Sequence, residues 1–163
     1  MKLSELILKT NSFLKNDLPQ FEELIGINSR KELIKNINFL NKTKGVYVFE
    51  HSDNGVIYIG SSGKVNRKKN KNSEICLNGL GSRLIRSSTP YSFVNENLCY
   101  DKIINSDSKK KKSNYYKSFL LNDIKIYYIK TGEIPFTVPT VLEHLLIQVY
   151  YHSGKLPLIN NQL

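Results

Sequence analysis

The chain has 163 residues, enough for one domain with a sizeable core, and its 24 Lys and Arg outnumber 14 Asp and Glu. The resulting net charge of +10 favours a polyanionic partner such as nucleic acid, although a lysine-rich chain that merely stays soluble has the same balance. No stretch is apolar enough for a membrane span or a signal-peptide core. The two cysteines, Cys76 and Cys99, have no metal-ligand spacing, so we expect reduced thiols in a cytoplasmic protein.

Residues 1–41 predict a helical N-terminal extension. Ser4 is expected to cap a first helix, and Pro19 to open a short second one. Ser29 and Glu32 have the spacing of a capping box, which introduces a third helix. Packing on the core is the favoured role of this extension, with DNA contact and self-association as alternatives.

A β-hairpin is expected next. Two β-branched and aromatic runs, 45–50 and 56–60, flank a polar turn that contains Asn54-Gly55, and both of these residues tolerate the positive φ of a tight turn. A turn of two or four residues places three aromatic rings on one face: Tyr47, Phe49 and Tyr58. The opposite face, which we interpret as the core side, then holds four aliphatic side chains: Val46, Val48, Ile57 and Ile59. The alternative is an ordinary hairpin with surface tyrosines.

A basic loop follows the hairpin. It carries five cationic residues with almost no apolar anchor: Lys64, Arg67, Lys68, Lys69 and Lys71. One interpretation is a phosphate-binding arm, because each cation that neutralises a phosphate releases counterions. A solvated loop without a partner fits equally well.

The second half of the chain predicts helices and one more strand. Ser82 is expected to cap a helix that carries Arg83 and Arg86, and the lysine run at 108–113 is a second candidate phosphate contact. Aromatic residues between these segments, including Tyr91, are interpreted as core. Residues 124–130 predict a strand that joins the hairpin in a small antiparallel sheet.

A last helix is expected from Thr140, with Glu143 on a face that reaches the groove beside the sheet. Thr140 and Glu143 also have capping-box spacing, and on spacing alone we favour that structural role for the carboxylate.

Gly45-Val46-Tyr47 and Tyr58-Ile59-Gly60 resemble the paired signature of the GIY-YIG nuclease family, with Val in place of Ile in the first triplet. Further matches follow in the same order: Arg83-Leu84, then Glu143 near the start of a helix, then a closing segment that ends at Asn160. The resemblance covers roughly residues 43–163. It implies an α+β fold with a small three-stranded antiparallel sheet flanked by helices. The nuclease domain would span 42–163, after the 1–41 extension, with a basic insertion at about 64–78.

The resemblance also implies a site. Its catalytic residues would be Tyr47, Tyr58, Arg83, Glu143 and Asn160. The charge of the basic loop and of the helix that follows it, and not the resemblance, gives the expected DNA-binding residues: Lys64, Arg67, Lys68, Lys69, Lys71 and Arg86. Glu143 would bind one Mg²⁺ (or Mn²⁺) per active site. Tyr58 would act as the base with Tyr47 as its partner, which requires cations such as Lys64, Arg67 or the metal because a phenol titrates near pH 10.

The sequence leaves two assignments open, the identity of the catalytic arginine and the role of Asn160. Arg67 is a rival to Arg83 as the catalytic arginine, and Asn160 either bonds a catalytic group or the phosphate, or fastens the C-terminus to the sheet.

The expected activity is that of a divalent-metal-dependent endonuclease that hydrolyses double-stranded DNA, most simply a site-specific restriction-type enzyme. One active site cuts one strand per visit, so a homodimer or sequential nicking is expected for a double-strand break. The alternatives are a non-cleaving nucleic-acid-binding module on the same scaffold, a repair or mobile-element nuclease, and a basic interaction domain.

Overall fold

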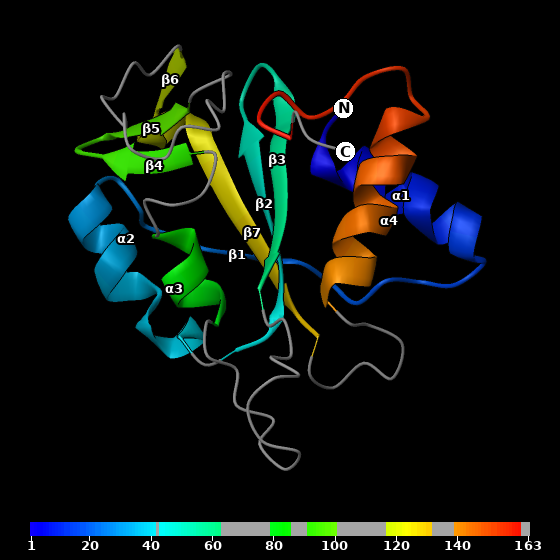
Figure 1. The fold of residues 1–163 in the computed structure, drawn as a ribbon, viewed down its shortest axis with the longest axis horizontal. Helices are drawn as coiled ribbons and strands as arrows, with labels where there is room; N and C mark the ends of the chain where they lie inside the picture. Colours follow the sequence, from blue (N-terminus) through cyan, green and yellow to red (C-terminus); the bar gives the residue numbers. More distant parts are fainter. Residues whose placement is uncertain (42, 63–78, 86–90, 101–116, 132–138, 161–163) are drawn as a thin grey trace, which may run out of the picture.

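The computed structural model describes residues 1–41, 43–62, 79–85, 91–100, 117–131 and 139–160. Within these ranges the fold is α+β, with a four-stranded antiparallel sheet of order β1-β7-β2-β3 and a three-stranded antiparallel sheet of order β4-β5-β6. Helices α1 and α4 cover one face of the larger sheet, while α2, α3 and the smaller sheet cover the other (Figure 1).

The described elements in chain order are α1 (Leu3–Leu14), β1 (Glu22–Glu23), α2 (Arg30–Asn36), the 3-10 helix η1 (Asn38–Leu40), β2 (Gly45–His51), β3 (Gly55–Ser62), α3 (Leu80–Leu84), β4 (Tyr91–Val94), β5 (Asn97–Tyr100), β6 (Lys117–Leu120), the 3-10 helix η2 (Leu121–Asp123), β7 (Ile124–Lys130) and α4 (Pro139–Tyr151).

The larger sheet has one strand more than the sequence predicts. β7 joins the hairpin as expected, but β1 then pairs with β7, so the short helix predicted after Pro19 is wrong. Phe21 is buried in the cluster on one face of the sheet and Leu24 in the cluster on the other. A helix would place residues three apart on one face, whereas an extended segment supplies both faces.

Both faces of the hairpin are buried. Phe49 pairs with Tyr58, so Tyr47, Phe49 and Tyr58 share a face as predicted. The prediction that only the opposite face is core is wrong, because residues from α2, η1 and α3 bury the aromatic face as thoroughly as α1 and α4 bury the aliphatic one.

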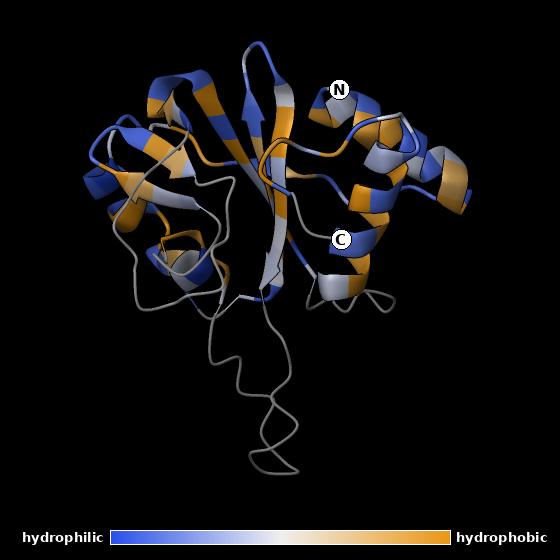
Figure 2. Cartoon of the chain, turned by 45° about the horizontal axis from the view of Figure 1, so that its top comes forward, coloured by the Kyte–Doolittle hydropathy of each residue, from blue (hydrophilic) through white to orange (hydrophobic). Residues whose placement is uncertain are grey.

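β7 alternates between hydrophobic and hydrophilic residues along much of its length (Figure 2).

A β-bulge changes one predicted side-chain direction. The register shifts between Phe49 and Glu50, so that Phe49 pairs with Tyr58 while Glu50 pairs with Val56. Ile57 is the extra residue, and it joins the aromatic cluster instead of the aliphatic face on which simple alternation puts it.

The N-terminal helices are capped in different ways. In α2 the amide of Glu32 donates to Ser29 Oγ at 3.2 Å, which confirms the predicted cap. For α1 the prediction is wrong, because the N-cap position is Lys2 and Ser4 lies inside the helix. There the Glu50 carboxylate accepts the hydrogen bond of the Leu3 amide at 2.6 Å.

Candidate active site

The candidate site lies at the open end of the hairpin, opposite its turn. Tyr47 is fully buried and Tyr58 is 7% exposed, with ring centroids 5.8 Å apart. Tyr47 pairs with Gly60, and a Cβ at Gly60 would lie 2.7 Å from the Tyr47 hydroxyl oxygen. Position 60 therefore has no room for a side chain while the phenol lies across it.

Glycine is needed at position 45, in the other triplet, for a different reason. A Cβ at Gly45 would lie 2.0 Å from the carbonyl oxygen of Ile129 on the neighbouring strand. Close packing between β2 and β7 thus explains Gly45, and the position of a phenol explains Gly60.

Arg83 reaches the site from α3, a short helix held against η1. The amide of Leu80 donates to the Thr43 carbonyl at 2.7 Å, and a Cβ at Gly81 would lie 2.5 Å from the Ile37 carbonyl oxygen. The prediction that Ser82 caps this helix is wrong, because the helix begins at Leu80 and its N-cap residue is Gly79.

The Arg83 side chain is half-buried, and its positive charge partly opposes the burial that raises the pKa of both Tyr47 and Tyr58. It forms no ion pair with any other described residue. Arg67 lies outside the described residues, so the structure does not decide between the two arginines.

A third phenol, which sequence reasoning assigned to packing alone, completes this cluster. The Tyr91 hydroxyl donates to the Tyr47 hydroxyl at 3.0 Å and to the Arg83 carbonyl at 3.4 Å, and the Tyr91 ring lies 4.9 Å from that of Tyr58. No spacing rule links position 91 to the hairpin. The β4 strand brings Tyr91 there.

The phenols are kept neutral by their surroundings. Burial raises the pKa of Tyr58 well above its ordinary value, and Tyr47 and the negative charge of Glu143 raise it further. Burial, followed by Tyr91, likewise raises the pKa of Tyr47. Arg83 opposes both shifts without cancelling them. The cations expected to favour a phenolate, Lys64 and Arg67, lie outside the described residues.

Glu143 approaches from the other face of the sheet. It lies on α4, is half-buried, and accepts a hydrogen bond from the hydroxyl of Ser61 on β3. β3 is the edge strand, so the carboxylate sits beside that edge, close enough to raise the pKa of Tyr58. The capping-box interpretation is wrong, because α4 begins at Pro139 and Thr140 lies within it.

The donors at this edge suit a hard cation. The described residues contain no group of three or more His, Cys, Asp or Glu that could hold a metal ion. Mg²⁺ retains several waters and is commonly bound by one or two carboxylates plus phosphate oxygens. The carboxylate of Glu143, beside the Ser61 hydroxyl, fits that mode of binding.

Asn160 uses both ends of its amide on the backbone of β3. The Ile59 amide donates to Asn160 Oδ1 at 2.7 Å, and Asn160 Nδ2 donates to the Ile59 carbonyl at 2.7 Å. The Ile159 amide also donates to the Ile57 carbonyl at 2.8 Å. The structure thus shows the fastening role, in which the closing segment covers part of the sheet edge beside Tyr58.

The predicted DNA-binding residues lie outside the part of the chain that the structure describes: Lys64, Arg67, Lys68, Lys69, Lys71 and Arg86. Cys76 lies there too, whereas Cys99 is a buried free thiol. None of the helices in the described ranges has the length and hydropathy needed to span a bilayer.

Comparison with protein-family models, with curated proteins and with solved structures finds no match to this chain. The resemblance to the GIY-YIG nucleases therefore rests on the motif residues, and functional arguments rest on the geometry given above.

Proposed function

We propose that this chain is a divalent-metal-dependent endonuclease that hydrolyses phosphodiester bonds in double-stranded DNA. The observation that supports it most is the gathering of four polar groups around one end of the hairpin. Tyr47, Tyr58 and Arg83 lie on one face, and the charge of Glu143 acts on Tyr58 from across the edge strand. The hairpin supplies the two tyrosines, and α3 and α4, which lie further along the sequence, supply Arg83 and Glu143.

In this proposal water attacks the phosphorus and the bond to the 3′ oxygen breaks. The Arg83 guanidinium stabilises the negative charge that develops on the phosphate, because its fixed fork of donors matches phosphate oxygens. The Tyr58 side chain, supported by Tyr47, orients the attacking water and takes its proton, while solvent protonates the departing 3′ oxygen. Glu143 would hold one Mg²⁺ (or Mn²⁺), which when bound neutralises the phosphate and the departing oxygen.

The pKa of Tyr58 limits its role as a base. A neutral phenol accepts a proton poorly, so the proposal requires a cation beside Tyr58 once DNA is bound. This cation would be Lys64, Arg67 or the ion that Glu143 would hold.

The raised pKa values favour one rival, a nucleic-acid-binding module that does not cut. A protonated Tyr58, beside Arg83 and with the buried Tyr47 behind it, can bind a phosphate without activating water. This rival predicts DNA binding that needs no divalent ion and tolerates Glu143→Ala.

We further propose a restriction-type role in the cytoplasm, with a dimer or two successive nicks giving a double-strand break. A repair or mobile-element nuclease is the alternative within this class.

The test is incubation of the purified protein with plasmid and with phage genomic DNA, in Mg²⁺ or in EDTA. Discrete fragments that require Mg²⁺ support restriction, and a smear supports nonspecific or structure-directed cutting. Intact DNA that is nevertheless bound supports the non-cleaving module. DNA that is neither cut nor bound at low salt contradicts both the nuclease and the non-cleaving module.

A further inference from the structure

A second aromatic group lies on the same face of the sheet as the phenols. Phe39, on η1, is 58% exposed and packs edge-on against the Tyr128 ring with centroids 6.0 Å apart. The Lys130 ammonium lies 5.9 Å from the centroid of each ring. We refer to Phe39, Tyr128 and Lys130 as the Phe39 platform.

Strand pairing places this platform beside the candidate active site. Tyr128 pairs with Tyr47, and Lys130 pairs with Gly45 at the open end of the hairpin. Paired residues on neighbouring antiparallel strands face the same side of a sheet, and such strands lie about 4.8 Å apart. The η1 segment that carries Phe39 also packs against α3, which carries Arg83. A DNA strand whose phosphate lies at Arg83 is therefore near the platform.

The charge of the platform is positive. Among the described residues, the interactions of the Lys130 ammonium are its contacts with the two rings, and it forms no ion pair there. The Glu22 carboxylate accepts a hydrogen bond from the Tyr128 hydroxyl. Burial and Glu22 raise the pKa of Tyr128 to about 12, so that phenol carries no charge near neutral pH.

Exposure of one apolar side chain is ordinary and needs no function. Phe13 shows this, since it is 70% exposed on α1, which packs on the opposite face of the sheet. Phe13 has no aromatic or cationic partner among the described residues, whereas the Phe39 ring is held in place by both. An exposed, fixed ring beside an unpaired ammonium matches how proteins bind single-stranded nucleic acid, by base stacking and phosphate contact.

We propose that the Phe39 platform binds an unstacked nucleotide next to the scissile phosphate, with the base on the Phe39 ring and its phosphate at Lys130. This inference rests on the proposed function, because it requires a DNA strand at the site. A ring can stack only on a base that has left the double helix, so the platform recognises single-stranded or locally opened DNA.

The test measures the affinity of full-length protein for a fluorescent single-stranded oligonucleotide and for its duplex, at low salt in EDTA so that no cleavage occurs. Phe39→Leu removes the ring and keeps an apolar side chain, and Phe13→Leu is the matched control. Phe39→Leu is expected to weaken single-strand binding by roughly 5- to 100-fold, Phe39→Trp to restore it, and Phe13→Leu to leave it unchanged. Lys130→Gln is expected to make the negative slope of log K against log salt shallower by about 0.7.

Equal binding by Phe39→Leu and Phe13→Leu overturns the inference, as does weakening that Phe39→Trp fails to restore. Thermal unfolding of each variant identifies those that fail to fold, and the Lys130→Gln salt slope remains an independent check. Wild-type protein that binds but does not cut in Mg²⁺ removes the proposed nuclease activity and leaves the platform. Wild-type protein that cuts while both Phe39 variants bind normally removes the platform alone.

Discussion

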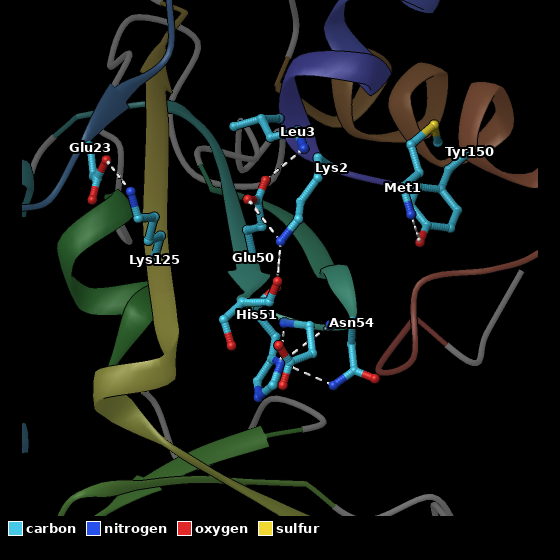
Figure 3. A network of polar contacts seen from close by, with 11 residues as sticks. Met1, Lys2, Leu3, Glu23, Glu50, His51, Asn54, Lys125 and Tyr150 are labelled. Atoms are coloured by element: carbon cyan, nitrogen blue, oxygen red, sulfur yellow. Dashed lines mark hydrogen bonds and ion pairs between the residues drawn. The ribbon is translucent and has the colours of Figure 1, made fainter.

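The two ends of the β2–β3 hairpin carry similar polar residues in opposite circumstances. At the turn end, the Glu50 carboxylate accepts from the Leu3 amide and lies 3.9 Å from the Lys2 ammonium (Figure 3). His51 Nδ1 accepts from the amides of Asp53 and Asn54, which fixes the turn. Every one of these groups has a partner within the fold.

At the open end, neither Arg83 nor Glu143 forms an ion pair with another residue that the structure describes. Arg83 forms no ion pair in the described ranges, and the partner of Glu143 there is a neutral hydroxyl, that of Ser61. Half-buried charges without an ionic partner cost stability, and no described residue supplies an opposite charge within ion-pair distance of either group. Contacts among the described residues thus account for the charges at the turn end, whereas those at the open end stay available to a ligand in the proposed function.

Replacing one carboxylate at each end of the hairpin by alanine tests this comparison most sharply. Glu143→Ala is expected to lower DNA cleavage by about 1,000-fold or more, because the metal and the charge that it neutralises are lost together. DNA binding in EDTA should stay close to wild type. Glu50→Ala is the control, which should lower the free energy of unfolding and leave cleavage by the folded protein intact.

Equal cleavage by Glu143→Ala and wild type would assign Glu143 a structural role like that of Glu50. Cleavage rates on plasmid DNA and urea unfolding of both variants provide the comparison.

The second-largest loss of cleavage is expected at Tyr58, with Tyr150 as the matched control. Tyr58→Phe is expected to slow cleavage by roughly 100- to 10,000-fold, the range for loss of a group that handles a proton. Tyr150, at the turn end, receives a 3.5 Å contact from the Met1 amino group, so Tyr150→Phe should cut at the wild-type rate. Single-turnover rates measure both, and a Tyr58→Phe variant with full activity removes Tyr58 from the proton transfer.

Tyr91→Phe should have a smaller effect. It deletes the hydroxyl that donates to Tyr47 but keeps the ring among its aromatic neighbours. Loss of one net hydrogen bond is worth about 0.5–1.5 kcal/mol, so we expect cleavage to fall about 10-fold or less. A change in KM with kcat unaltered would show that Tyr91 helps to bind DNA and does not position Tyr47.

Asn160→Ala should act mainly on stability. Two hydrogen bonds to Ile59 are lost, and we expect the free energy of unfolding to fall by about 1–3 kcal/mol. Urea denaturation measures this loss. Unchanged stability together with abolished cleavage would instead favour the catalytic role for its amide.

The sequence predicted those parts of this fold that depend on local pattern. Alternation within two short strands placed Tyr47 and Tyr58 on one face, and Ser29 marked the start of α2. The β-bulge at Ile57 and the strand at Glu22–Glu23 depend on what covers each face of the sheet, which local pattern does not contain.

The site shows the same limit. The two triplets identified the phenols, but the contribution of Tyr91 depends on a strand that is distant in sequence. The capping-box spacing of Glu143 predicted the wrong partner, because position 61 on the edge strand, and not the local helix end, determines what its carboxylate contacts.

The most direct test of the central claim is a crystal structure of Tyr58→Phe bound to the DNA that the wild-type protein cuts, in Mg²⁺. The account predicts that one phosphate contacts the Arg83 guanidinium and also an ion held by Glu143. A phosphate that contacts Arg83 with no ion at Glu143, or DNA bound on another face of the protein, would contradict it.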